Sequence, residues 1–233
     1  ISGSLISVTP ATTTVYTVTV TDNCSSPADS AKVTVTVNPL PAVSFSADTT
    51  NGCYPLCVTF TNSSTPSSAS ATWEFGDGNT ANSVTTATNC YQNSGLFTVQ
   101  LSVTDDFGCT NSASAFDMIN VFPHPTANFG TSPNPISIIE PTVYFQDLST
   151  GSVNQWEWSL GDVQNSNTNV QNPTYTYQDT GYYNVQLIVM DNNGCTDSIT
   201  KTIYVEGQYV IYVPNAFTPN GDGINDVFYP KGT

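Results

Sequence analysis

The sequence predicts an all-β chain made of β-sandwiches in tandem. Three observations lead to this fold class: strand-forming residues are abundant, one long segment recurs, and the strands of each copy alternate apolar with polar residues. The 233 residues include 12 Tyr and 11 Phe, which favour strands, and 15 Gly and 15 Pro, which favour turns. No window has apolar residues at helical spacing, so helices are not expected.

The long segment recurs with the period of a whole domain. Three similar strands lead to Cys24, Cys109 and Cys195, and these cysteines are 85 and 86 residues apart. Trp73 and Trp158 precede similar Gly-Asp turns, also 85 residues apart, and both are expected to fill a core. A period of this length exceeds that of a solenoid unit and indicates repeated domains.

The strand before Cys109 shows the alternation most clearly. Phe97, Val99, Leu101 and Val103 share one face, and the residues between them are polar, as in a half-buried antiparallel strand. About seven short strands in each copy, separated by Gly, Asn, Asp and Pro, indicate a β-sandwich. Further strands are predicted at residues 57–61, 71–75, 116–121, 142–146, 155–160 and 198–205.

One motif carries a family resemblance. Residues 73–78 (Trp-Glu-Phe-Gly-Asp-Gly), Tyr91 and residues 95–99 (Gly-Leu-Phe-Thr-Val) resemble a polycystic-kidney-disease (PKD) domain. The family implies an immunoglobulin-like sandwich that is typically extracellular and serves as a spacer or interaction module. A second copy follows, with Val163 in place of the last Gly of the motif. Prolines on both sides of His124 stiffen the connection, so the resemblance implies immunoglobulin-like (PKD-type) sandwiches in a rod-like array.

The C-terminal residues carry a second resemblance. Residues 212–228 are similar to the opening of the gliding-motility-associated C-terminal domain of Bacteroidetes, the type B sorting signal of the type IX secretion system. This resemblance implies export by the type IX machinery and outer-membrane attachment at the cell surface. The residues that carry it are Pro214, Asn215, Phe217, Pro219, Asn220, Gly221, Asp222, Gly223, Asn225 and Asp226.

The two resemblances divide the chain into four predicted parts. Residues 1–39 correspond to the C-terminal half of an immunoglobulin-like or PKD-like sandwich, so the chain is expected to start inside a domain. Residues 40–123 and 124–206 are the first and second PKD-like domains. Residues 207–233 are the beginning of a truncated sorting domain.

The cysteines are expected to form disulfides. Six cysteines, no Cys-X-X-Cys pair and a single histidine argue against a zinc site, and disulfides agree with an exported protein. The four cysteines of the first PKD-like domain allow three pairings. The preferred bonds are Cys53–Cys109 and Cys57–Cys90, because a Cys53–Cys57 bond would close a very short loop.

Cys24 and Cys195 occupy the position of Cys109 in their own copies. The residue of the second PKD-like domain that matches Cys53 is Ile139, so Cys195 is predicted to be left over. A lone buried thiol, a partner outside these residues and a cross-link between chains all remain open for the two cysteines.

The loop at residues 220–226 is a candidate calcium site. Its ligands would be Asn220, Asp222 and Asp226, because hard cations such as Ca²⁺ take several oxygen ligands. Turn formation by Asn-Gly and Asp-Gly explains the same residues equally well. No other cofactor is expected.

The remaining acidic residues are predicted to serve turns. The Gly-Asp-Gly turn at residues 76–78 is expected to be structural, with its carboxylate accepting hydrogen bonds from backbone N–H groups. Asp22, Asp105 and Asp191 end the same strand in each copy and are expected to cap the turn that follows.

Catalysis finds little support in the residues. A Ser–His–Asp triad would need His124, which lies in the proline-flanked connection. The carboxylate pairs Glu74/Asp77 and Glu157/Asp162 are interpreted as solvated strand ends rather than as a glycosidase pair. The chain is therefore predicted not to be an enzyme.

Aromatic residues leave one binding alternative open. Trp156 and Trp158 share one face of a strand, which is expected to be the core face. Tyr182 and Tyr183 point to opposite faces, so one of them is expected to be more exposed. An exposed aromatic row stacks well on sugars, which keeps a glycan among the candidate partners.

Composition and the two resemblances together lead to a predicted function. The net charge of −15, with three Lys and no Arg, excludes a basic surface for nucleic acid, and no apolar run approaches the ~20 residues of a membrane span. We predict a non-catalytic stalk of a secreted bacterial surface adhesin or filament protein, with neighbouring domains or subunits as partners. The alternatives are an accessory region of a secreted polysaccharide hydrolase or protease, and a glycan-binding or protein-binding module.

Overall fold

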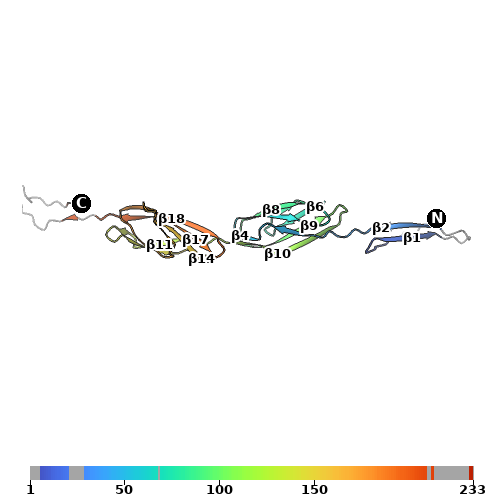
Figure 1. Ribbon diagram of the computed structural model, residues 1–233, viewed down its shortest axis with the longest axis horizontal. Coiled ribbons are helices and arrows are strands. Elements are labelled where there is room, and N and C mark those ends of the chain that lie inside the picture. The colour runs from blue at the N-terminus through green and yellow to red at the C-terminus, as the bar shows by residue number, and fades with distance from the viewer. Residues whose placement is uncertain (1–5, 21–28, 68, 209–210, 213–230, 233) are drawn as a thin grey trace, which may run out of the picture. The chain divides into compact units, whose positions relative to one another are not determined.

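The computed structural model describes residues 6–20, 29–67, 69–208, 211–212 and 231–232. Every regular element in these residues is a β-strand (Figure 1), which confirms the predicted all-β fold class. The chain divides into two compact units, Ile1–Val121 and Phe122–Thr233, and each unit contains one β-sandwich. The described residues include no helix long and apolar enough to cross a membrane.

The first sandwich pairs a three-stranded sheet with a five-stranded sheet, and residues of both sheets form one core. The small sheet has the order β3-β5-β8 and consists of β3 (Phe45–Ala47), β5 (Leu56–Asn62) and β8 (Thr86–Tyr91). The large sheet has the order β4-β10-β9-β6-β7 and consists of β4 (Asn51–Cys53), β6 (Ser70–Glu74), β7 (Thr80–Asn82), β9 (Gly95–Thr104) and β10 (Thr110–Phe122).

The second sandwich repeats this arrangement around its own core. Its small sheet has the order β11-β13-β16, with β11 (Phe129–Ser132), β13 (Thr142–Asp147) and β16 (Thr174–Thr176). Its large sheet has the order β12-β18-β17-β14-β15, with β12 (Ile136–Ser137), β14 (Val153–Ser159), β15 (Asn167–Thr168), β17 (Gly181–Asp191) and β18 (Thr196–Glu206).

Two further strand pairs lie outside the sandwiches. An antiparallel pair is formed by β1 (Thr14–Val20) and β2 (Asp29–Val35), and a short pair by β19 (Ile211–Tyr212) and β20 (Lys231–Gly232). Val18 and Val33 of the first pair are each 52% exposed. Two strands alone bury little apolar surface, so this pair differs from the packed strands of the sandwiches.

The alternation of β9 decides which of its faces enters the core. Val99, Leu101 and Val103 are at most 1% exposed, whereas Gln100 and Ser102 lie between them on the opposite face. The same alternation on β17 buries Val185, Leu187 and Val189. The polar face of each large sheet is therefore left free of core packing.

A tryptophan lies at the centre of each core, as the sequence predicts. Trp73 on β6 is fully buried, with its ring edge-on to Phe45 at 5.5 Å between the centroids. Trp158 on β14 is fully buried beside Phe129 and Phe145, with centroid distances of 5.1 and 5.5 Å. These rings dominate the apolar area that each sandwich buries.

The two tryptophans differ in one polar contact. The Nε1–H of Trp73 donates to the carbonyl oxygen of Ser83 at 3.0 Å. The Nε1 of Trp158 is buried and has no hydrogen-bond partner among the described residues. A phenylalanine in place of Trp158 therefore breaks no hydrogen bond of the indole nitrogen.

We expect Trp73→Phe to destabilise the first sandwich more than Trp158→Phe destabilises the second. Both variants remove part of a ring from a packed core, but Trp73→Phe also takes the donor from Ser83, which costs about 1 kcal/mol. Urea denaturation of the full chain, followed by circular dichroism, measures both free energies of unfolding. Equal losses in the two variants would contradict a stabilising role for the Trp73 hydrogen bond.

Candidate functional site

An aspartate lies at the start of the turn that joins the two longest strands of each sandwich, β9 to β10 and β17 to β18. Oδ1 of Asp105 accepts hydrogen bonds from the backbone N–H groups of Phe107 and Cys109, both at 2.9 Å. Asp191 does the same for Asn193 and Cys195, both at 2.8 Å. The predicted capping by these two aspartates is confirmed. Their counterpart in the first copy, Asp22, lies outside the described residues.

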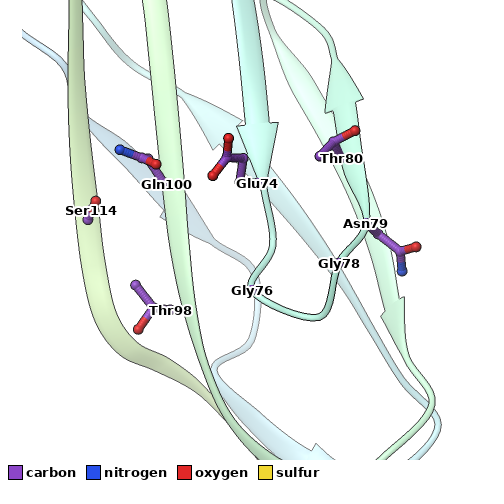
Figure 2. A pocket seen from close by; sticks show the side chains of 8 residues that line it. All are labelled: Glu74, Gly76, Gly78, Asn79, Thr80, Thr98, Gln100 and Ser114. Carbon is purple, nitrogen blue, oxygen red and sulfur yellow. The ribbon is translucent and has the colours of Figure 1, made fainter.

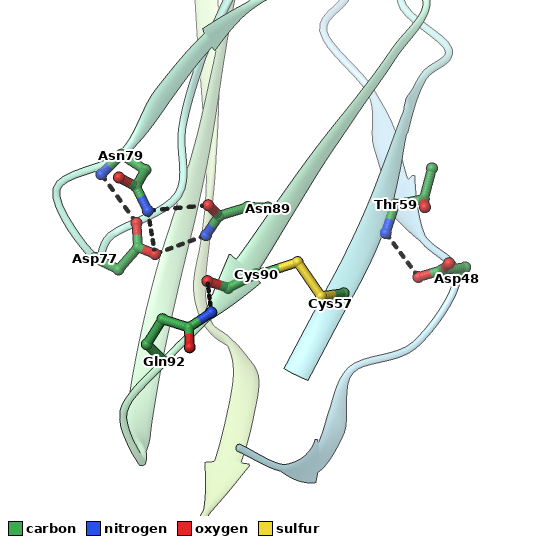
Figure 3. The surroundings of a disulfide bond; sticks show 8 residues. All are labelled: Asp48, Cys57, Thr59, Asp77, Asn79, Asn89, Cys90 and Gln92. Atoms are coloured by element: carbon green, nitrogen blue, oxygen red, sulfur yellow. Dashed lines mark hydrogen bonds between the residues drawn. A yellow bond between two sulfur atoms is a disulfide. The ribbon is translucent and has the colours of Figure 1, made fainter. Parts of the chain in front are cut away.

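The Gly-Asp-Gly turn is a structural unit, shown at the left of Figure 3. Oδ1 of Asp77 accepts the backbone N–H of Asn79 at 3.0 Å, and Oδ2 accepts the side-chain amides of Asn79 and Asn89 at 2.9 and 2.7 Å. Gly76 has a φ of 82°, and a Cβ there would lie 2.5 Å from the carbonyl oxygen of Thr98. The turn therefore needs glycine at this point and uses the carboxylate for internal bonds.

The second sandwich builds the same corner differently. Asp162 is buried and accepts hydrogen bonds from the backbone N–H and the hydroxyl of Ser166, both at 2.7 Å, and from the hydroxyl of Tyr175. Burial raises the pKa of Asp162, but the hydrogen bonds from Tyr175 and Ser166 lower it by more, so the pKa lies below its usual value. None of these hydrogen bonds connects Asp77 or Asp162 to a second carboxylate, so both aspartates have structural roles.

A buried tyrosine hydroxyl closes each corner; Tyr91 belongs to the PKD motif named above, but no role was predicted for its hydroxyl. Tyr91 donates to the carbonyl oxygen of Phe75 at 3.0 Å, and Tyr177 donates to that of Leu160 at 2.8 Å. Burial raises the pKa of Tyr91 to about 12 and also raises the pKa of Tyr177. The repeat period could have shown that the two tyrosines are equivalent, because they are separated by the same interval as Cys109 and Cys195.

The structure contains one of the two predicted disulfides of the first PKD-like domain. Cys57 and Cys90 are directly opposite each other on β5 and β8 and are bonded (Figure 3). Cys109 has a free thiol, so the predicted Cys53–Cys109 bond is wrong. Cys53 itself is disulfide-bonded.

The length of β10 explains why Cys53 and Cys109 do not meet. Strand β4, which ends at Cys53, lies beside the end of β10, where the N–H of Asn120 donates to the carbonyl oxygen of Thr50 at 2.8 Å. Cys109 precedes the start of β10. At about 3.3 Å per residue, the 13 residues of this strand span up to roughly 40 Å.

The prediction for Cys195 is also wrong. It is buried and disulfide-bonded rather than left over. The prediction failed because it sought a partner only at Ile139, the position that matches Cys53. The other cysteine predicted to be left over, Cys24, lies outside the described residues.

The structure separates the candidate catalytic groups from one another. His124 is anchored within the second unit, where its Nδ1 forms a hydrogen bond with the carbonyl oxygen of Thr196 at 2.7 Å. Glu74 and Glu157 are exposed strand residues, and Glu157 lies on the face opposite Trp158. Among the described residues, no group of three or more His, Cys, Asp or Glu side chains could hold a metal ion.

The aromatic residues follow their predicted parity. Trp156 packs against the core beside Trp158, and its Nε1–H donates to Asp147 at 2.7 Å. Tyr183 packs against the core as well. Tyr182 is 77% exposed and stacks on Tyr204, which lies opposite it on β18, with 4.6 Å between the ring centroids. Each exposed ring therefore covers one side of the other.

A polar groove lies on the outward face of the large sheet of the first sandwich; we call it the outer groove. It has a volume of about 390 Å³. Figure 2 shows its side chains on neighbouring strands, with Glu74 as the carboxylate and hydroxyl or amide groups around it. The lining residues are Glu74, Gly76, Gly78, Asn79, Thr80, Thr98, Gln100 and Ser114.

The predicted calcium loop and sorting motif lie outside the described residues. They include Asn220, Asp222 and Asp226 as calcium ligands, and the whole motif from Pro214 to Asp226. Both therefore remain predictions from the sequence.

Comparisons with known proteins identify the sandwiches. The family model described as PKD domain matches residues 36–121 and 120–207. The collagenase ColA of Clostridium perfringens (strain 13 / Type A) is 34% identical over 89 residues. That alignment covers 36% of this chain and 8% of the collagenase, so the chain spans only a small part of that relative.

Solved structures of PKD domains are also similar to this chain. The PKD1 domain of the Vibrio cholerae metalloprotease PrtV is 27% identical, with a TM-score of 0.31, and the match covers 36% of this chain and 98% of that domain. The PKD1 domain of Vibrio anguillarum Epp is 26% identical, with a TM-score of 0.32, and the match covers 36% of this chain and 96% of that domain.

We expect the double variant Cys57→Ala/Cys90→Ala to lower the free energy of unfolding of the first sandwich by about 3 kcal/mol. The bond links residues 33 positions apart, and losing it frees the unfolded chain. The matched control is Cys109→Ala, which should change the free energy of unfolding little. Urea denaturation of the full chain measures both, and a double variant as stable as the wild type would contradict the expected contribution of the bond.

We expect Tyr175→Phe to destabilise the second sandwich at pH 7, and to do so less and less as the pH falls through the folded pKa of Asp162. The lowered pKa of Asp162 means that its bonds stabilise the fold above the pKa of the unfolded state, and that this stability is lost as the pH falls through the folded pKa. Losing the Tyr175 bond should cost about 1 kcal/mol at pH 7.

Urea denaturation of the full chain at a series of pH values tests this dependence. The control is Tyr144→Phe, because Tyr144 is 58% exposed in the same sandwich. A loss in Tyr175→Phe that is the same at pH 7 and at low pH would show that the bond does not act through the ionised carboxylate of Asp162.

Proposed function

This chain belongs to the PKD domain family, and from that premise we propose that it is a non-catalytic spacer in a secreted bacterial surface adhesin or filament protein. The observation that carries the proposal is the tandem repetition of a whole sandwich. The two family matches meet at residues 120–121, so little chain is available between them for a flexible tether. Prolines 123 and 125 further restrict the backbone there.

The chemistry of the sandwiches supports an extracellular location. The Cys57–Cys90 bond is of the kind that persists in oxidising compartments. The turns are held by aspartates that accept backbone hydrogen bonds, as at Asp105 and Asp191, and these bonds need no ligand. A spacer with such corners keeps its shape without a cofactor.

Type IX export is a further part of the proposal, and it rests on the sequence of residues 212–228. The resemblance of these residues to a type B sorting signal supports the type IX machinery as a partner and attachment at the outer membrane. The loop at residues 220–226 keeps calcium as a proposed ligand, with Asn220, Asp222 and Asp226 in that role.

One comparison favours a second candidate function. Because a collagenase shares 34% identity with part of this chain, the sandwiches are also suited to be the accessory region of a secreted protease or polysaccharide hydrolase. The two candidates differ in what accompanies the sandwiches in the whole protein: further repeats for a stalk, and a catalytic domain for a hydrolase.

We expect the second PKD-like domain to be replaceable in the bacterium that makes the protein. Exchanging residues 124–206 for an unrelated immunoglobulin-like domain of similar length should preserve surface display and adhesion, because a spacer contributes length and stiffness. Deleting the same residues should weaken adhesion while the protein remains at the surface. Adhesion measurements and surface labelling of intact cells compare the two variants.

Opposite results would overturn separate parts of the proposal. Adhesion lost in the exchanged variant would show that residues 124–206 bind something specific. In the same strains, removal of the residues from 209 onward should keep the protein inside the cell. Normal surface labelling after that deletion would overturn the sorting role without affecting the spacer role.

A further inference from the structure

The two sandwiches differ at one place in an otherwise equivalent pair of long strands. In the second sandwich, Thr202 alone lies between the register pairs Val185–Lys201 and Tyr183–Ile203. In the first sandwich, three residues of β10 lie between the pairs Val99–Ala115 and Phe97–Ile119. The first sandwich therefore has a β-bulge with two extra residues opposite Thr98.

One residue of the bulge is an exposed phenylalanine. Phe116 is its first residue and is 83% exposed, and the alternation of β10 places it on the same face as Ser114. The next residue, Asp117, has a φ of 49°, which is unusual for a residue other than glycine, and its N–H donates to Oγ1 of Thr98 at 3.1 Å. Bulges commonly redirect side chains next to functional sites.

Phe116 lies two residues along β10 from Ser114, one of the residues that line the outer groove. Thr98 and Ser114, which flank the bulge, both line the groove (Figure 2). The other polar side chains there include Gln100, Glu74 and Thr80 from adjacent strands. Hydroxyl, amide and carboxylate groups supply both donors and acceptors, which is what the hydroxyl groups of a sugar require.

We propose that the outer groove and Phe116 form a binding site for a neutral polysaccharide. Phe116 stacks against the apolar face of a sugar ring, while Gln100 and Glu74 form hydrogen bonds with its hydroxyl groups. This proposal goes beyond the spacer function and does not depend on it. It assigns a ligand to the first sandwich, whereas the spacer test exchanges the second.

Charge favours a neutral ligand over an acidic one. Residues 36–121 contain no Lys, Arg or His, so this sandwich has no cationic side chain to pair with uronate or sulfate groups. Glu74 inside the groove would repel such groups.

The lining also favours a glycan over a protein partner. The centres of protein interfaces are apolar and rich in aromatic residues, Met and Arg. The described residues that line the outer groove carry hydroxyl, amide and carboxylate groups, and none of them is aromatic, Met or Arg.

Affinity electrophoresis of the full chain tests the proposal. The gels contain hydroxyethyl cellulose, xylan, galactomannan or laminarin as neutral polysaccharides, and alginate as the acidic one. At least one neutral polysaccharide should retard the chain, and alginate should not. Phe116→Ala and Gln100→Ala should each weaken the apparent affinity by about tenfold or more, as expected where a few residues carry most of the binding energy.

Two matched controls locate the site. Phe107→Ala removes another exposed phenylalanine of the first sandwich, and Tyr182→Ala removes the exposed tyrosine of the second. Both should bind as the wild type does. Circular dichroism and the urea midpoint should be unchanged in Phe116→Ala and Gln100→Ala, because neither residue belongs to the core.

Five results would overturn the proposal, the first four of them in the gels. These are no retardation by any of the neutral polysaccharides, retardation by alginate alone, wild-type affinity in Phe116→Ala, and loss of binding in Tyr182→Ala instead. Capture of a protein partner through Phe116 without any retardation by the polysaccharides would also overturn it.

Discussion

The packing of one tryptophan between two sheets is the constraint on which each sandwich depends. Trp73 and Trp158 are fully buried and are surrounded by phenylalanines from the opposite sheet. A ring of this size sets the separation of the sheets, so every strand of a large sheet must direct alternate residues toward it. The other residues of these strands are thereby assigned to the outward face, where no packing constrains them.

The acidic composition follows from the turns that join these strands. Asp105 and Asp191 each hold two backbone N–H groups, and Asp77 and Asp162 hold the corner beside the tryptophan strand. A carboxylate acting this way satisfies donors that would otherwise be lost at the turn, and it needs no cationic partner. Part of the net charge of −15 therefore reflects turn formation repeated in tandem.

The sequence predicted the features that depend on periodicity and missed those that depend on distance. Alternation was enough to place β9 and its core face, and the repeat period was enough to match Asp105 with Asp191. The Cys53–Cys109 bond failed because the two cysteines lie near opposite ends of β10, a separation that strand patterns do not report. The bulge was missed for a related reason, since Phe116 reads as an ordinary residue of an alternating strand until its register with β9 is known.

The position of the bulge shows how the two copies acquire different surfaces without losing a common core. Ile119 resumes the register after the bulge and is fully buried, so two extra residues leave the core side of β10 intact. Met118 of the bulge still packs against the core, whereas Phe116 is exposed on the outward face. A change of the same size on the core side would have to be accommodated around Trp73, in a close-packed interior that tolerates little extra volume. The outward faces are therefore where tandem sandwiches of this kind are free to differ in function.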